Sequence, residues 1–382
     1  MTRLLRALPV PSGQTMLGLL PRLAELLDGR GDAVLPVPAD DAEQAHFLAS
    51  ELAADEPIAE DVAVVISTSG TTGKPKGAML TSDALAASGS ATHARLGGTG
   101  QWLLALPPHH IAGMQVLLRS IQAGTEPVVI DVSAGFSLSD FMRGAAEMTG
   151  NRRYISLVAT QLVKVLDHPA ASEALAAFDA VLLGGGPLPA TVAIRAAQAR
   201  VPVVRTYGMS ETCGGCVYDG LALAGVRVCI GQEGRISLGG VTVASGYRNM
   251  LEHKAFTEPG WFHTDDFGEL DGGRLRVLGR LDEAIGTGGL TVVPQVVEAV
   301  LATHPLVAEC AVFGVPDDRL GQRVAVAVVP SSAGTPTLEE LRAHITAALE
   351  DTAAPRELHL LDELPRHGIG KLDRRALVKR FS

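Results

Sequence analysis

The sequence predicts an α/β protein with more than one domain: a large N-terminal domain of stacked sheets and helices, with a small β subdomain, followed by a C-terminal α+β domain. Two observations support this class. Apolar runs alternate with helix-like segments over roughly the first 220 residues, and short glycine-punctuated strands follow. With 382 residues, the chain also exceeds the usual size of one domain.

The N-terminal part opens with an amphipathic segment at 17–27 that predicts a helix, and the apolar run at 61–70 predicts a buried strand. Further helices are expected at 83–96 and 156–167. Several strand candidates end in glycine, proline or hydroxyl residues, which matters because open α/β sheets bind ligands beyond the carboxyl ends of their strands. The remaining strand candidates are 102–107, 126–131, 180–186 and 201–208.

Short strands between glycines predict the small β subdomain at about 225–281. We expect the domain boundary directly after it, which gives an N-terminal domain at 1–281 and a C-terminal domain at 282–382. Within the C-terminal domain the pattern predicts helices at 295–304 and 337–350, and strands at 308–317, 322–330 and 356–365.

The composition excludes several classes of protein. The 42 acidic residues outnumber the 32 basic ones, and the net charge of −10 argues against a general binder of nucleic acid or anionic membranes. No apolar run reaches the roughly 18 to 20 residues that span a bilayer. Four cysteines are too few for a disulfide framework, so a cytoplasmic location is expected. We interpret the pair Cys213 and Cys216 as packing residues rather than a zinc site.

The strongest local signal is the segment 67–77, STSGTTGKPKG, which we call the phosphate segment. It holds five hydroxyl residues, three glycines and two lysines directly after an apolar run. These residues supply hydrogen-bond donors, backbone freedom and positive charge together, as a phosphate site requires. It is not a Walker A loop, because Lys74 is followed by Pro75 and the glycine spacing is shorter.

Six further motifs follow in order: PPHHIAG (107–113), GGGPLP (184–189), YGMSET (207–212), GWFHTDDFGEL (260–270), GRLDEAIGTGG (279–289) and PRHGIGKLDRR (365–375). With the phosphate segment they resemble the adenylate-forming superfamily, which includes acyl-CoA synthetases, peptide-synthetase adenylation domains and luciferases. The resemblance implies that ATP and Mg²⁺ activate a carboxylic acid as an acyl-adenylate, with pyrophosphate release. The acyl group then passes to a thiol, that of coenzyme A.

The resemblance also implies roles for residues of these motifs. The phosphate segment would hold the ATP phosphates, 184–187 would pack along the adenine, and Asp266 and Arg280 would contact the ribose. The expected nucleotide-binding residues are Ser67, Thr68, Ser69, Gly70, Thr71, Thr72, Gly73, Lys74, Lys76, Gly184, Gly185, Gly186, Pro187, Thr206, Tyr207, Gly208, Met209, Ser210, Asp266 and Arg280.

Three catalytic residues are expected on the same grounds: Lys371, Thr206 and Glu211. Glu211 would hold Mg²⁺, a hard cation suited to carboxylate and phosphate oxygens. Lys371 would stabilise the charge that develops as pyrophosphate leaves. Asp282 matches the hinge about which a mobile C-terminal domain turns between the two half-reactions. Gly288 and Gly289 would then help to form the coenzyme A tunnel.

Within the superfamily, segments such as SLVATQL (156–162) and SLGGVTVASGY (237–247) are most similar to the o-succinylbenzoate-CoA ligases of menaquinone biosynthesis. That acid has two carboxylates, so its pocket needs a cation. Lys164, one helical turn after Thr160, is the candidate. The acid-binding residues expected are His109, His110, Thr160, Lys164, Gly185 and Ser210.

Two departures from the superfamily pattern concern the site. Asp265 stands where glycine is usual before the ribose aspartate, and 288–294 reads GGLTVVP in place of GGENVYP. Three alternatives stay open: a ligase for another aryl or short-chain acid, an enzyme that loads a carrier protein, and a non-catalytic nucleotide sensor. The expected partners are a small carboxylic acid, ATP and coenzyme A, with no nucleic acid and no membrane insertion. A homo-oligomer is left open.

Overall fold

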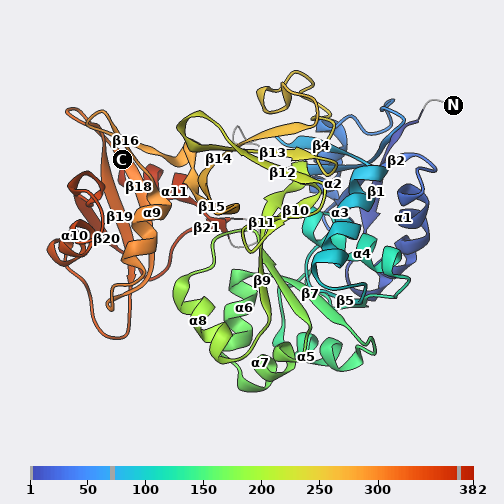
Figure 1. Ribbon diagram of the computed structural model, residues 1–382, viewed down its shortest axis with the longest axis horizontal. Coiled ribbons are helices and arrows are strands. Elements are labelled where there is room, and N and C mark those ends of the chain that lie inside the picture. The colour runs from blue at the N-terminus through green and yellow to red at the C-terminus, as the bar shows by residue number, and fades with distance from the viewer. Residues whose placement is uncertain (1–2, 69–73, 368–370) are drawn as a thin grey trace.

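The computed structural model describes residues 3–68, 74–367 and 371–382, without the side chains of Glu233, His367 and Lys371. The described strands form four larger sheets and one short hairpin, with helices packed against them (Figure 1). The mixed α/β class predicted from the sequence is the class observed.

The first sheet has the order β1-β2-β3-β4, in which β1 to β3 are parallel and β4 is antiparallel to β3. Thr68 pairs with Lys76, so the two ends of the phosphate segment lie side by side. The helix expected at 17–27 is α-helical only from Leu20, where Pro21 occupies the first turn and needs no N–H partner. The elements are β1 (Leu5–Val10), η1 (Gly13–Leu19), α1 (Leu20–Leu27), β2 (Ala33–Pro38), α2 (Ala42–Glu51), β3 (Val62–Thr68), β4 (Lys76–Thr81) and α3 (Ser82–Arg95).

The second sheet has the order β11-β10-β9-β8-β7-β5-β6, and its strands from β9 to β6 are parallel. Its strands are β5 (Gln101–Leu104), β6 (Val128–Val129), β7 (Arg153–Val158), β8 (Ala180–Gly184), β9 (Val203–Met209), β10 (Gly214–Tyr218) and β11 (Leu221–Ala222). The helices are α4 (Ile111–Ala123), α5 (Leu138–Glu147), α6 (Ala159–Leu166), α7 (Pro169–Ala176), α8 (Ala190–Gln198) and the short η2 (Ser210–Thr212).

Both faces of this sheet are covered, which explains why its strands read as continuous apolar runs. Leu182 packs into a core that contains Leu117 of α4, whereas its neighbours Val181 and Leu183 pack into a second core with α5 to α8. The helix predicted at 156–167 is wrong in its first part, because residues up to Val158 belong to β7. A short apolar run does not distinguish a buried strand from a helix by its pattern alone.

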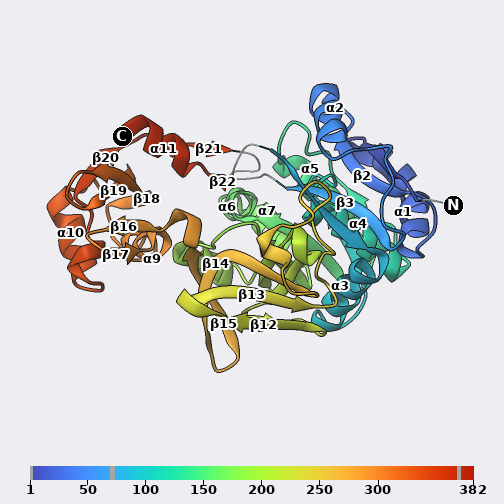
Figure 2. The same ribbon diagram turned by 90° about the horizontal axis from the view of Figure 1, so that it is seen from above.

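The third sheet is an antiparallel meander in the order β12-β13-β14-β15, with two short helical turns in its connections. In both ribbon views it lies between the first sheet and the C-terminal elements (Figure 2). Its elements are β12 (Val226–Ile230), η3 (Gln232–Gly234), β13 (Arg235–Gly240), η4 (Lys254–Phe256), β14 (Trp261–Asp271) and β15 (Arg274–Arg280).

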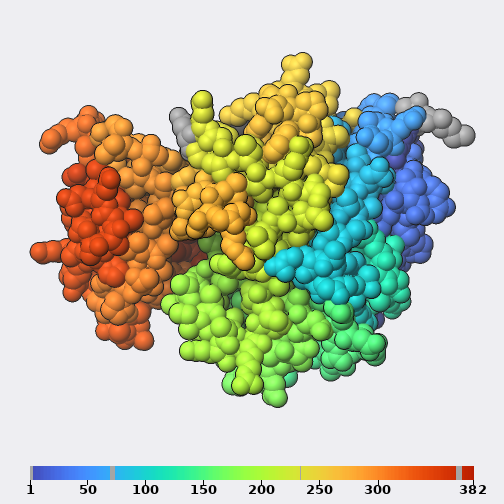
Figure 3. All heavy atoms as spheres, in the orientation of Figure 1, coloured from blue at the N-terminus to red at the C-terminus, as the bar shows by residue number. Residues whose placement is uncertain are grey.

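The C-terminal elements have cores of their own and form a lobe at one end of the molecule (Figure 3). Their sheet has the order β17-β16-β19-β18, with β20 beside β19. The elements are η5 (Leu281–Glu283), β16 (Ile285–Thr287), β17 (Leu290–Val292), α9 (Pro294–Leu301), β18 (Val307–Asp317), β19 (Gly321–Pro330), α10 (Leu338–Thr346), η6 (Asp351–Ala353), β20 (Glu357–Leu360), β21 (Arg366–His367), β22 (Lys371–Leu372) and α11 (Arg374–Phe381). The domain boundary after residue 281 and movement about Asp282 stay predictions.

Candidate active site

Four parallel strands of the second sheet, β5, β7, β8 and β9, end at the same edge. Sequence-predicted site residues follow or end each strand. His109 and His110 come after β5, Thr160 lies in the first turn of α6 after β7, residue 184 ends β8, and Thr206 to Met209 close β9. The topology therefore brings four separate motifs to one edge, the place where open α/β sheets bind ligands.

Glycine is required where β8 and β9 end. A side chain on Gly184 would place its Cβ 2.6 Å from the Thr206 hydroxyl, which donates to the Leu183 carbonyl at 3.2 Å. A Cβ on Gly208 would lie 2.1 Å from the carbonyl oxygen of Gly214. Backbone and side chain can approach this closely only without that Cβ. These contacts explain the glycines structurally, and the adenine contact expected for 184–187 stays a prediction.

Glu211 is held in place by a tyrosine from a distant part of the chain. It lies in η2 directly after β9, is buried, and accepts a 2.6 Å hydrogen bond from the Tyr247 hydroxyl. Burial and the Glu211 charge raise the pKa of Tyr247, so its phenol stays protonated and donates. The Glu211 carbonyl also accepts from the Ala244 N–H at 2.8 Å. The structure thus fixes both the backbone and the carboxylate of Glu211.

Asp266 joins the second and third sheets. The Tyr207 hydroxyl donates to Asp266 at 2.7 Å, and Arg280 Nη1 lies 3.5 Å from the other carboxylate oxygen. Burial raises the pKa of Asp266, while the Tyr207 hydrogen bond and the Arg280 charge act in the opposite direction. Arg280 also donates two 2.8 Å hydrogen bonds to Asp282. The expected ribose residues and the expected hinge residue therefore form one connected group.

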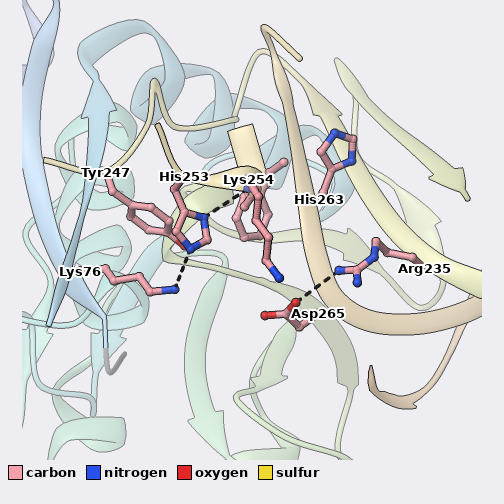
Figure 4. A pocket seen from close by; sticks show the side chains of 9 residues that line it. Lys76, Arg235, Tyr247, His253, Lys254, His263 and Asp265 are labelled. Carbon is pink, nitrogen blue, oxygen red and sulfur yellow. Dashed lines mark hydrogen bonds and ion pairs between the residues drawn. The ribbon is translucent and has the colours of Figure 1, made fainter. Parts of the chain in front are cut away.

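A pocket of about 290 Å³ lies beside Lys76, at the end of the phosphate segment (Figure 4). Lys76 Nζ is 3.3 Å from His253 Nε2, and Arg235 pairs with Asp265 at 3.2 Å. Burial lowers the pKa of His253, and the charges of Lys76 and Lys254 lower it further. The lining residues are Lys76, Arg235, Tyr247, His253, Lys254, Ala255, Phe262, His263 and Asp265.

Of these lining residues, only Lys76 is a site candidate from the sequence, so sequence reasoning assigned no site role to Arg235, Tyr247, His253 or Lys254. Tyr247 ends a segment already noted for its resemblance, SLGGVTVASGY, so its position carried a signal. The adjacent His253 and Lys254 form a small basic pair between polar and apolar residues, which is ordinary for a surface turn. Their distance from Lys76 along the chain hides the contact until the chain is folded.

The predicted acid-binding residues lie at the same sheet edge, with different exposure. His109 is half-buried and its ring contacts that of His110 in a tilted arrangement, with centroids 4.4 Å apart; burial lowers the pKa of His109. Thr160 and Lys164 are exposed on α6. Gln161 in α6 donates to the Ala105 carbonyl at 2.9 Å, so the start of α6 is tied to the segment that leads to the two histidines.

Ser69, Gly70, Thr71, Thr72 and Gly73 lie outside the described residues, as does the side chain of Lys371. Ser67 and Thr68 are half-buried at the end of β3, and Lys74 is exposed.

Gly288 and Gly289 form the two-residue turn between β16 and β17, with φ of 61° and 83°. Positive φ at both positions is typical of a type I′ hairpin and accounts for the glycines structurally.

The residues present fit the expected Mg²⁺. Glu211 offers a carboxylate that the Tyr247 hydroxyl holds in place, and the ring of the same tyrosine lies 5.1 Å from Lys76 Nζ of the phosphate segment. Among the described residues, no group of three or more His, Cys, Asp or Glu side chains is arranged to hold a metal. Mg²⁺ is commonly bound by one or two carboxylates together with substrate phosphates, so Glu211 and ATP would suffice.

Two family models match the chain. One, described as AMP-binding enzyme, matches residues 22–248, and the other, described as AMP-binding enzyme C-terminal domain, matches residues 296–371. No described helix is long and apolar enough to cross a membrane.

Relatives with assigned names also resemble the chain. A probable 2-succinylbenzoate–CoA ligase from Mycobacterium tuberculosis is 57% identical over 382 residues, covering 99% of each chain. A 2-succinylbenzoate–CoA ligase from Bacillus cereus is 34% identical over 343 residues, which cover 83% of this chain and 70% of the relative.

Solved structures share the fold. The o-succinylbenzoate CoA synthetase from Bacillus subtilis, in complex with its acyl-adenylate intermediate, aligns with a TM-score of 0.76 and 28% identity, covering 98% of this chain and 87% of the other. ATP-bound MatB from Rhodopseudomonas palustris aligns with a TM-score of 0.84 and 23% identity, covering 100% and 89%, and it shows the fold alone.

Proposed function

Because the chain belongs to the AMP-binding enzyme family, we propose that it is an ATP-dependent 2-succinylbenzoate–CoA ligase of menaquinone biosynthesis. One observation carries this proposal. The 57% identity to the Mycobacterium tuberculosis relative extends over 99% of both chains, so it includes the sheet edge, the third sheet and the C-terminal elements. The reaction uses ATP, Mg²⁺ and coenzyme A.

The first half-reaction forms the acyl-adenylate. A carboxylate oxygen of the acid attacks the α-phosphorus of ATP, the bond from that phosphorus to the pyrophosphate oxygen breaks, and pyrophosphate leaves. Lys76 and Glu211 both contact Tyr247, because Lys76 Nζ lies over the face of its ring and Glu211 accepts from its hydroxyl. We assign Lys76 to the phosphates and Glu211 to Mg²⁺. Bound Mg²⁺ would neutralise charge on the phosphate oxygens. We assign Lys371 the role of stabilising the negative charge that develops on the transferring phosphate, as the resemblance to the superfamily implies.

The second half-reaction forms the thioester. The sulfur of coenzyme A attacks the acyl carbon, the bond from that carbon to the AMP oxygen breaks, and the thiol proton is released. Asp282, Gly288 and Gly289 are assigned to the hinge and the thiol path. Asp282 accepts two hydrogen bonds from Arg280, itself beside Asp266, which supports a hinge that starts at the nucleotide site.

The choice of acid rests on the names of the relatives and on the chemistry of the sheet edge. 2-Succinylbenzoate carries one carboxylate to be activated and a second that needs a cation. Lys164 is exposed on α6, one turn after Thr160, and α6 is tied to the segment that leads to His109 and His110. We assign His109, His110, Thr160 and Lys164 to binding of the acid.

The test measures pyrophosphate released from ATP and Mg²⁺ with a panel of acids, with and without coenzyme A, and identifies the thioester by mass spectrometry. We expect release with 2-succinylbenzoate and a matching CoA product. Release with a different aryl or short-chain acid would keep the ligase chemistry and exclude this substrate. Adenylate formation without a CoA product would favour loading of a carrier protein, and no release with any acid would favour a sensor.

A cytoplasmic location is part of the proposal, and the few cysteines and the use of ATP and coenzyme A support it. The sequence leaves a homo-oligomer open, and sedimentation velocity of the purified protein decides the oligomeric state.

A further inference from the structure

The pocket beside Lys76 is rich in cations. Lys76, Lys254 and Arg235 line it together with a single carboxylate, Asp265. Asp265 is engaged by Arg235 at 3.2 Å, and no described residue forms an ion pair with Lys254. In Figure 4 the Lys254 side chain extends from η4 into the space between His253 and Asp265. The pocket therefore attracts an anion with more than one charge.

Hydrogen-bond donors in this pocket also outnumber its acceptors. His253 Nδ1 lies 3.2 Å from the Ala255 N–H, and His253 Nε2 lies 3.3 Å from the Lys76 ammonium. A neutral imidazole has one nitrogen that accepts and one that donates, so it cannot accept from both partners. If Nδ1 accepts from Ala255, then Nε2 carries a proton that points toward Lys76. A ligand whose oxygens only accept would resolve this conflict by accepting hydrogen bonds from both Lys76 and His253.

The pocket adjoins the two groups assigned to the ATP phosphates. Lys76 lies near the end of the phosphate segment, and its Nζ is 5.1 Å from the centre of the Tyr247 ring. Tyr247 lines the pocket and holds Glu211, the expected Mg²⁺ ligand, through its hydroxyl. A phosphate group held by Lys76 would therefore lie next to His253, in the pocket that Lys254 also lines.

We propose that His253, Lys254 and Arg235 form a subsite for the pyrophosphate group of ATP and for the pyrophosphate that the first half-reaction releases. This rests on the proposed adenylate-forming function, and it assigns these three residues to the leaving group. Lys254 supplies a long flexible cation and His253 supplies an Nε2–H donor. Arg235 Nη1 already donates to the Thr264 carbonyl at 2.6 Å and to Asp265 at 3.2 Å, so Arg235 supplies its remaining N–H groups. Asp265 holds Arg235 at the rim of the pocket.

The test is a calorimetric titration of the full chain with magnesium pyrophosphate, ATP and AMP, without any acid, so it does not depend on which acid the enzyme activates. Lys254→Met should weaken pyrophosphate binding five- to tenfold at low ionic strength and leave AMP binding within twofold. Lys254→Arg should restore it. The exposed Lys379 of α11 is the matched control, and Lys379→Met should bind all three ligands as the wild type does.

The ATP titration shows whether the subsite binds the pyrophosphate group while it is part of ATP or only after its release. If ATP binding and pyrophosphate binding weaken equally, the subsite binds the group while it is attached to ATP. If only pyrophosphate binding weakens, the subsite binds the group after its release. Pyrophosphate binding within twofold of the wild type in Lys254→Met would overturn the proposal. So would a loss of binding to desulfo-coenzyme A without a loss of binding to pyrophosphate, since the pocket would then hold the phosphates of coenzyme A.

Discussion

Acid should destabilise the protein through one buried histidine near the second sheet. His93 lies in the last turn of α3, is only 6% exposed, and accepts a hydrogen bond at 3.4 Å from the indole N–H of Trp102 through Nε2. Burial lowers the pKa of His93 to about 4, and the Arg119 charge contributes to this shift. Protonation at Nε2 would also remove the acceptor that Trp102 uses.

The size of the effect follows from the two pKa values of His93. In the unfolded chain a histidine has a pKa of about 6.5, so between pH 6.5 and 4 the unfolded state binds more protons than the folded state. Stability is therefore full above pH 6.5 and falls as the pH falls. Proton linkage gives a loss of roughly 2 kcal/mol at pH 5 and about 3 kcal/mol at pH 4 from this group.

Other groups titrate in the same range, so the test compares wild type with His93→Gln. Glutamine stays neutral, and its Oε1 can accept from Trp102. Both proteins carry Trp261→Phe, which leaves Trp102 as the single tryptophan that reports unfolding. Urea unfolding followed by fluorescence is measured from pH 7 to 4.5. We expect the stability advantage of the wild type over the variant to shrink by roughly 2 kcal/mol between pH 7 and 5. A constant difference would refute the assigned pKa of His93.

Three predictions concern catalysis. Lys371→Ala should slow adenylate formation by about 10²- to 10³-fold and leave thiol transfer from preformed adenylate within about threefold, because the charge that Lys371 stabilises develops only in the first step. Equal losses of rate in both steps would contradict this role. Tyr247→Phe removes the 2.6 Å hydrogen bond to Glu211 and should raise the Mg²⁺ concentration needed for half-maximal rate about tenfold, which corresponds to about 1.4 kcal/mol. An unchanged Mg²⁺ titration would mean that Glu211 is not a ligand of the metal. Lys164→Met should raise KM for 2-succinylbenzoate about tenfold with KM for ATP unchanged, and Lys164→Arg should recover part of the loss; equal KM values for the acid in wild type and Lys164→Met would remove Lys164 from the acid site.

Short segments with a distinct composition predicted several strands, the phosphate segment and the superfamily of this protein from its sequence. The phosphate segment combines hydroxyls, glycines and lysines within eleven residues, and the chemistry of phosphate binding needs all three close together. The apolar runs that became β8 and β9 were long enough to predict strands, and their polar ends predicted the ligand-binding edge. The order of the motifs identified the superfamily, because each motif is short and its residues are contiguous.

Contacts across long stretches of chain were decided only by the tertiary structure. Glu211 and Tyr247 are 36 residues apart, Tyr207 and Asp266 are 59 apart, and Lys76 and His253 are 177 apart. Each pair joins different elements, so no local pattern connects its members. The segment 156–158 shows the same limit: its apolar residues suit a helix or a strand equally, and pairing with β8 made it a strand. Packing between sheets, which the linear pattern does not encode, gave the pocket beside Lys76 its excess of cations.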